Sequence, residues 1–184
     1  MQRATKDLLY FETVPDNAPT LHVEPGEKFE VETQINRVPW LDDHPDREAL
    51  EVKLRGGNPS SGCIYVEGAE PGQMLIVHIG DMHARQGDGE VCGAGGIEAG
   101  GRVRIRCELT DLPSAMIWSR ITNDTHIMIA AQARPAEDAF RIALEEMVIW
   151  LEDDYGFSRG EAYLFLGQVL EERCTQYVDL RYLP

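Results

Sequence analysis

The sequence predicts a mainly β protein of the α+β class, with packed or barrel-like antiparallel sheets followed by a C-terminal helical hairpin. Apolar and polar residues alternate along several short segments in the first two thirds of the chain, as they do in half-buried strands. Beyond Pro135 the apolar residues instead recur at helical spacing. We therefore expect a β-rich body over residues 1–133. Residues 134–184 should form a helical hairpin and a closing strand, packed as one unit with the body.

Turn signals separate the expected strands. Glu24-Pro25-Gly26-Glu27 follows the first strand, and a similar Gly- and Pro-containing turn occupies residues 67–72. The long segment at residues 36–58 is rich in Pro, Asp, His and Gly and predicts a loop. Strands are expected at residues 21–23, 28–35, 63–66, 74–79, 101–109, 116–122, 125–131 and 177–183.

The strand at residues 101–109 has two distinct faces. Val103, Ile105 and Cys107 alternate with three arginines at positions 102, 104 and 106. Such a cationic face can suggest an anion-binding site. We interpret it as the solvent-facing side of a strand whose arginines pair with neighbouring acids.

Two helices are predicted near the C-terminus. Pro135 suits the first turn of one helix, and Gly156 ends it. Ser158 is the expected N-cap of the next helix, and Glu161, three residues later, completes a capping box. Met147 and Trp150 lie on the apolar face of the first helix and predict core packing.

Composition excludes several classes of function. The formal net charge is −15, which disfavours binding to nucleic acid or to an anionic membrane surface. The sequence has no Cys-x-x-Cys pair, so a thiolate zinc knuckle is not expected. It also shows no apolar leader and no run long enough to cross a bilayer, and we therefore expect a cytoplasmic protein.

The most informative segment is the run Gly-Asp-Met-His-Ala-Arg-Gln-Gly-Asp-Gly-Glu-Val-Cys at residues 80–92. It follows an apolar strand, and its glycines allow positive φ or close approach of a ligand. Acid and imidazole groups on a loop can bind a metal or transfer protons. The alternative is an acidic, glycine-rich turn between two strands. Either interpretation makes residues 80–98 a motif loop within the body.

Three segments resemble the acetamidase/formamidase family of amide hydrolases. One is the run containing Asn-Pro and Val-Glu-Gly-Ala-Glu-Pro-Gly at residues 58–72, and another is the motif at residues 80–98. The third spans residues 139–179, with Gly156, Glu161-Ala162-Tyr163 and Val178-Asp179. The chain is similar to a short form that lacks the family's central segment, because Ile79 runs directly into Gly80.

The resemblance implies hydrolysis of small linear amides of the formamide or acetamide type, giving ammonia and a carboxylate. A divalent metal, with zinc the first choice, would polarise the carbonyl and activate water. Asp81 and His83, two apart on an extended segment, could reach one ion. Further ligands could come from Asp42, His44 or His126. The remaining expected roles are general base for Glu90, ligand or orienting group for Asp88, and substrate contacts for Gln86 and Glu98.

Two other hypotheses stay open. The chain could be a non-catalytic small-molecule or metal-binding protein on the same scaffold, since the central segment is missing. Alternatively, another chain could supply part of the site. Uncovered sheet edges and exposed apolar patches favour association with another chain, so we expect a homodimer.

Overall fold

The structure is a computed structural model that describes residues 1–10, 12, 14–33, 60–84, 100–113 and 116–174. The described chain divides into two compact units, Met1–Asp111 and Leu112–Cys174. Each unit has its own buried apolar cluster. No helix in the described ranges is long and apolar enough to cross a membrane. The loop expected at residues 36–58 and the strand expected at 177–183 lie outside these ranges.

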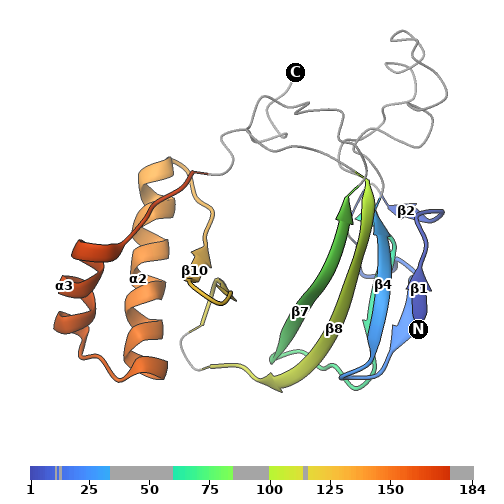
Figure 1. Ribbon diagram of the computed structural model, residues 1–184, viewed down its shortest axis with the longest axis horizontal. Coiled ribbons are helices and arrows are strands. Elements are labelled where there is room, and N and C mark those ends of the chain that lie inside the picture. Colours follow the sequence, from blue (N-terminus) through green and yellow to red (C-terminus); the bar gives the residue numbers. More distant parts are fainter. Residues whose placement is uncertain (11, 13, 34–59, 85–99, 114–115, 175–184) are drawn as a thin grey trace, which may run out of the picture. The chain divides into compact units, whose positions relative to one another are not determined.

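A four-stranded sheet forms the centre of the first unit (Figure 1). Its strands, in spatial order, are β1 (Gln2–Ala4), β4 (Lys28–Thr33), β8 (Gly101–Asp111) and β7 (Gln73–Ala84). Strand β8 pairs antiparallel with both β4 and β7, whereas β1 pairs parallel with β4. Smaller pairs join β2 (Leu9–Tyr10) to β5 (Ser60–Ser61) and β3 (Pro19–Val23) to β6 (Cys63–Val66).

The mainly β fold class is confirmed, although the strand pairing is mixed. The pairs β1–β4 and β3–β6 are parallel. Parallel strands need a crossover connection, and the chain between β1 and β4 supplies one by passing through β2 and β3. Local alternation predicts strands but not their partners, so these two pairings could not be read from the sequence.

The core of the first unit lies against one face of the large sheet. Its buried residues are Val23, Phe29, Val66 and Cys107. Phe29 and Val23 are each 1% exposed. The alternation predicted for β8 explains this arrangement, because Ile105 and Cys107 share the face that packs on the core. The opposite face carries the charged residues of the same strands.

Strand β7 is longer than the sequence predicts. The expected strand ended at Ile79, with a loop beginning at Gly80, but pairing with β8 continues to Ala84 opposite Gly101. The motif loop expected from residue 80 is therefore wrong for its first five residues. The cause is backbone pairing: β8 supplies partners up to Ile79 and again from Met82 to Ala84, and glycine at position 80 does not prevent an extended conformation.

The second unit pairs a β-hairpin with two helices. The hairpin joins β9 (Ser119–Thr122) to β10 (Ile127–Ala130), and the helices are α2 (Ala136–Tyr155) and α3 (Arg159–Val169). Figure 1 shows the two helices side by side, with β10 beside α2. The cluster buried here contains Met147, Val148, Trp150, Leu151, Ala162 and Leu166.

The helix boundaries follow the predicted signals. Pro135 is the N-cap of α2, and Gly156 ends that helix in the left-handed region at φ 73°. Ser158 accepts a hydrogen bond from the Glu161 amide, while the Glu161 carboxylate accepts one from the Ser158 amide. The capping box is therefore confirmed. The Ser158 hydroxyl group also donates to the Glu161 carboxylate at 2.6 Å, and this bond, together with the one from the Ser158 amide, lowers the pKa of the Glu161 carboxyl group.

Candidate functional site

One face of the large sheet carries charged side chains in cross-strand rows. Glu32 on β4 lies opposite Arg102 on β8, and Arg102 lies opposite His83 on β7. In the next row Glu30 lies opposite Arg104. Acids of β4 thus face arginines of β8 directly, which is the favourable arrangement for opposite charges on paired strands.

A β-bulge brings Asp81 and His83 to this charged face. Ile79 pairs with Ile105 and Met82 with Val103, so two residues of β7, Gly80 and Asp81, lie opposite the single residue Arg104. Before the bulge, Val77 and Ile79 share the apolar face with Cys107 and Ile105. Regular alternation would continue that face at positions 81 and 83. The extra residue moves both polar side chains to the other face.

Asp81 belongs to a chain of ion pairs that crosses all four strands. Its Oδ2 accepts a hydrogen bond from Arg104 Nη1 at 2.7 Å, and Arg104 Nε is 3.3 Å from Glu30 Oε1. Arg3 Nη2 donates to Glu30 Oε2 at 2.8 Å. Glu30 is only 7% exposed. Its hydrogen bond with Arg3, aided by Arg104, lowers the pKa of the Glu30 carboxyl group.

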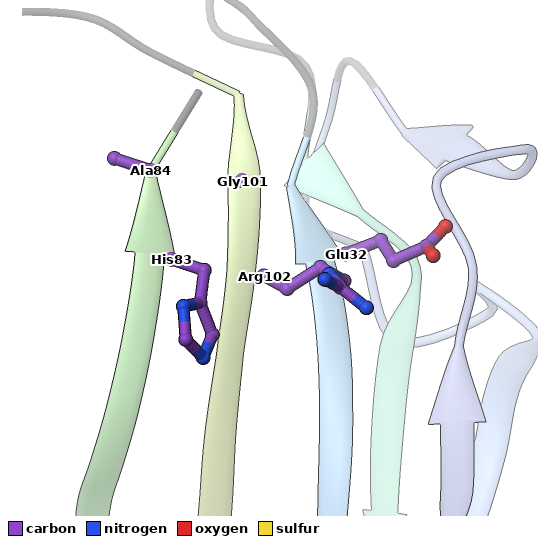
Figure 2. A pocket seen from close by; sticks show the side chains of 5 residues that line it. All are labelled: Glu32, His83, Ala84, Gly101 and Arg102. Carbon is purple, nitrogen blue, oxygen red and sulfur yellow. The ribbon is translucent and has the colours of Figure 1, made fainter. Parts of the chain in front are cut away.

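A pocket of about 320 Å³ opens at the end of the sheet, beside the last two paired rows of β7 and β8 (Figure 2). Its volume falls at the lower end of the roughly 300–1,000 Å³ of small-molecule sites. It is lined by Glu32, His83, Ala84, Gly101 and Arg102. The residues come from β4, β7 and β8, so rigid paired strands rather than a loop position the side chains.

Gly101 allows β7 and β8 to approach each other closely at this pocket. A Cβ atom at position 101 would lie 2.6 Å from the His83 carbonyl oxygen and 3.1 Å from Ala84 Cα. Both neighbours are backbone atoms, which cannot rotate away. Glycine at position 101 therefore allows the segment of β7 that carries His83 to lie this close to β8.

The described residues supply two of the expected metal donors. Asp81 and His83 share the charged face, as their spacing predicts. Asp81 uses Oδ2 for Arg104, and its Oδ1 is left for another partner. A neutral imidazole and a carboxylate are donors that suit zinc. The described ranges contain no group of three or more donors, and the expected residues Gln86, Asp88, Glu90 and Glu98 lie outside them.

The other histidines in the described ranges have local partners. His126 occupies the turn between β9 and β10, where its Nδ1 is 2.7 Å from Thr125 Oγ1. His22 Nδ1 is 2.9 Å from Glu67 Oε1, and His78 Nε2 is 3.3 Å from Glu108 Oε2. Asp42 and His44, the other expected ligand sources, lie outside the described residues.

Sequence reasoning missed four residues that shape the site: Glu30, Glu32, Arg102 and Gly101. A signal for the first three was present. Glu30 and Glu32 alternate with apolar residues on one strand, and the arginines alternate in the same way on another. Complementary charge patterns of this kind favour neighbouring strands. The sequence does not show that these two strands are neighbours, and it is the pairing of β4 with β8 that brings the acids and arginines together.

Several solved structures share the fold. An acetamidase from Yersinia enterocolitica matches with a TM-score of 0.75 at 20% identity, covering 91% of this chain and 85% of that one. An acetamidase from Bacillus halodurans matches with a TM-score of 0.70 at 17% sequence identity, covering 90% of this chain and 89% of that one. A predicted acetamidase/formamidase from the thermophile Thermoanaerobacter tengcongensis matches with a TM-score of 0.76 at 16% sequence identity, covering 97% of this chain and 92% of that one.

The fold is thus that of proteins described as acetamidases. The sequence model of the Acetamidase/Formamidase family matches residues 77–184, which is more than half of the chain. The chain belongs to the acetamidase/formamidase family, as the resemblance of its motifs predicts. No curated protein matches it. The family match includes β7 from Val77 onward and therefore Asp81, His83 and the pocket residues of β8.

Proposed function

We propose that this protein hydrolyses small linear amides, of the formamide or acetamide type, to ammonia and a carboxylate. The observation that carries the proposal is the bulge in β7, which puts Asp81 and His83 on the charged face. His83 lines the pocket there. The bulge lies within the segment matched by the family model. Membership of a family of acetamidases and formamidases supports the reaction class.

Asp81 and His83 would hold a divalent metal, with zinc the first choice. Such an ion, when bound, lowers the pKa of its water and polarises a carbonyl group. Arg104 holds one oxygen of the Asp81 carboxylate, so Asp81 would offer its other oxygen in a fixed orientation. The buried Glu30 in turn holds Arg104. These contacts orient the carboxylate before substrate arrives.

The remaining roles fall to residues of the motif beyond β7. We assign Glu90 as the general base that takes a proton from the attacking water and then delivers it to the leaving nitrogen. Asp88 is assigned as a ligand or as the group that orients this base. Gln86 and Glu98 would hold the substrate through its amide group. Each assignment follows from the chemistry of the side chain and its place in the family motif.

The test is ammonia release from formamide and acetamide by wild type, His83→Ala, Glu90→Gln and His78→Ala. The last variant is the matched control, because His78 lies on the same strand and face but pairs with Glu108 away from the pocket. We expect turnover by wild type and by His78→Ala, and its loss from the other two. Absence of turnover in wild type, with or without added zinc, would favour a binding protein on the same scaffold.

A further inference from the structure

The three arginines of β8 differ in what surrounds them. Arg104 pairs with Asp81 and Glu30, and Arg106 Nη1 is 2.6 Å from Glu108 Oε1. The expectation that acids neutralise the arginine face is confirmed for these two residues. Arg102 differs, since it makes no hydrogen bond or ion pair with any residue in the described ranges. It is also the arginine that lines the pocket.

Glu32 is the acid placed to neutralise Arg102, because the two residues are cross-strand partners. Its Oε1 instead lies 3.5 Å from Arg3 Nη1. Figure 2 shows the Arg102 side chain reaching across the sheet toward β4, while the Glu32 carboxylate points onward, away from His83. The pocket therefore contains a guanidinium group without a bonded counter-charge among the described side chains.

We propose that Arg102 binds a carboxylate group in this pocket. A guanidinium group presents two parallel N–H donors that match the two oxygens of a carboxylate. The chain as a whole is strongly acidic and repels small anions, so an anionic ligand needs a local cation of this kind. That the anion is a carboxylate rests on the proposed function, because amide hydrolysis generates one.

The carboxylate has two possible sources, the product acid or a second acid group carried by the amide substrate. Arg102 and His83 are direct cross-strand partners. Both residues also line the same pocket. A monoamide of a short dicarboxylic acid could therefore place its carboxylate at Arg102 and its amide beside His83. Both sources share the same contact with Arg102.

Binding of acetate, malonate and succinate tests the proposal without requiring turnover. Calorimetric titrations would compare wild type with Arg102→Gln, Arg102→Lys and Arg106→Gln. The last variant removes the same charge from the same strand and face outside the pocket. We expect Arg102→Gln to weaken binding of at least one of these carboxylates about tenfold or more, Arg102→Lys to weaken it less, and Arg106→Gln to match wild type.

Two results would overturn the proposal: wild type binds none of the three carboxylates, or Arg102→Gln and Arg106→Gln bind them equally well. Circular dichroism of each variant confirms that the fold is retained. Hydrolysis of malonamate beside acetamide distinguishes the sources. A substrate carboxylate predicts that Arg102→Gln raises KM for malonamate alone, whereas a product carboxylate predicts weaker inhibition by acetate with both KM values unchanged.

Failure of this inference differs from failure of the proposed function. If amide turnover requires His83 but carboxylate binding is unchanged in Arg102→Gln, the hydrolase proposal is retained and the proposed role of Arg102 is rejected. If carboxylate binding requires Arg102 but the protein hydrolyses no amide, the role of Arg102 is retained and the hydrolase proposal is rejected.

Discussion

Asp81 Oδ2 accepts a hydrogen bond from Arg104 Nη1 at 2.7 Å, although regular alternation along β7 would place Asp81 on the opposite face of the sheet. The bulge at Gly80 and Asp81 makes this contact possible. It also places Met82 on the apolar face, opposite Val103, and His83 beside Arg102. One additional residue thus decides which side chains of the motif face the pocket.

Deletion of Gly80 should remove the extra residue and restore regular alternation. Asp81 would then lie directly opposite Arg104 and His83 opposite Arg102, so both side chains stay on the charged face. We expect this deletion to unfold at a urea concentration close to that of wild type. Deletion of Met82 is the contrast, because it leaves one of the two polar side chains on the apolar face, where a polar group without a partner is unfavourable. Equal stability of the two deletions would contradict the assigned register.

Gly101→Ala should displace the end of β7. The new methyl group would meet the His83 carbonyl oxygen at 2.6 Å, so the backbone must move. We expect a loss of about 1–3 kcal/mol in the free energy of unfolding. Gly160→Ala is the control, since no atom lies within 4 Å of its added Cβ and alanine favours helix. It should be neutral or stabilising by up to about 1 kcal/mol. Equal effects of the two changes would refute the close approach.

Glu30→Gln should destabilise the protein in a pH-dependent way. Hydrogen bonds from Arg3 and Arg104 lower the pKa of Glu30 in the folded state. Their contribution is therefore present above the unfolded-state pKa of about 4.3 and is lost as pH falls through the lower folded-state pKa. We expect wild type to be more stable than the variant at pH 7, and the difference to shrink below about pH 4. Denaturant titrations across this range provide the measurement, and a difference independent of pH would be inconsistent with the assigned ion pairs.

Ser158→Ala should weaken the start of α3. The change removes the side chain that accepts from the Glu161 amide and costs about 1 kcal/mol in the free energy of unfolding. Ser158→Thr keeps a hydroxyl group and should retain most of that stability. If alanine and threonine at this position are equally stable by thermal unfolding, the cap does not contribute.

A homodimer is expected from the exposed row on β7. Leu75, Val77, Ile79 and Met82 are 45–66% exposed. In the described sheet β7 is an edge strand. Long apolar edges favour pairing with another chain, and antiparallel pairing of two copies of β7 satisfies both edges. Light scattering at micromolar concentration should give twice the chain mass. Ile79→Lys should shift the mass toward the monomer, and a monomeric wild type would contradict the expectation.

The sequence predicts local features of this protein better than their long-range pairing. Ser158 and Glu161 are close in sequence, so their capping box was predicted correctly. The two faces of β8 were also predicted, because alternation is a local property. The face occupied by His83 could not be predicted, since it depends on a bulge fixed by pairing with β8. The pocket needs β4 as well, which is distant in sequence.

Metal content measured by elemental analysis, on protein purified without chelator, tests the central claim most directly. Wild type should carry about one zinc or similar ion per chain, and His83→Ala should lose it, while His78→Ala should retain it. That result would place a metal at the end of β7 beside Asp81 and His83. Equal metal content in all three proteins, or none in any of them after incubation with zinc, would contradict a metal-assisted site at these residues.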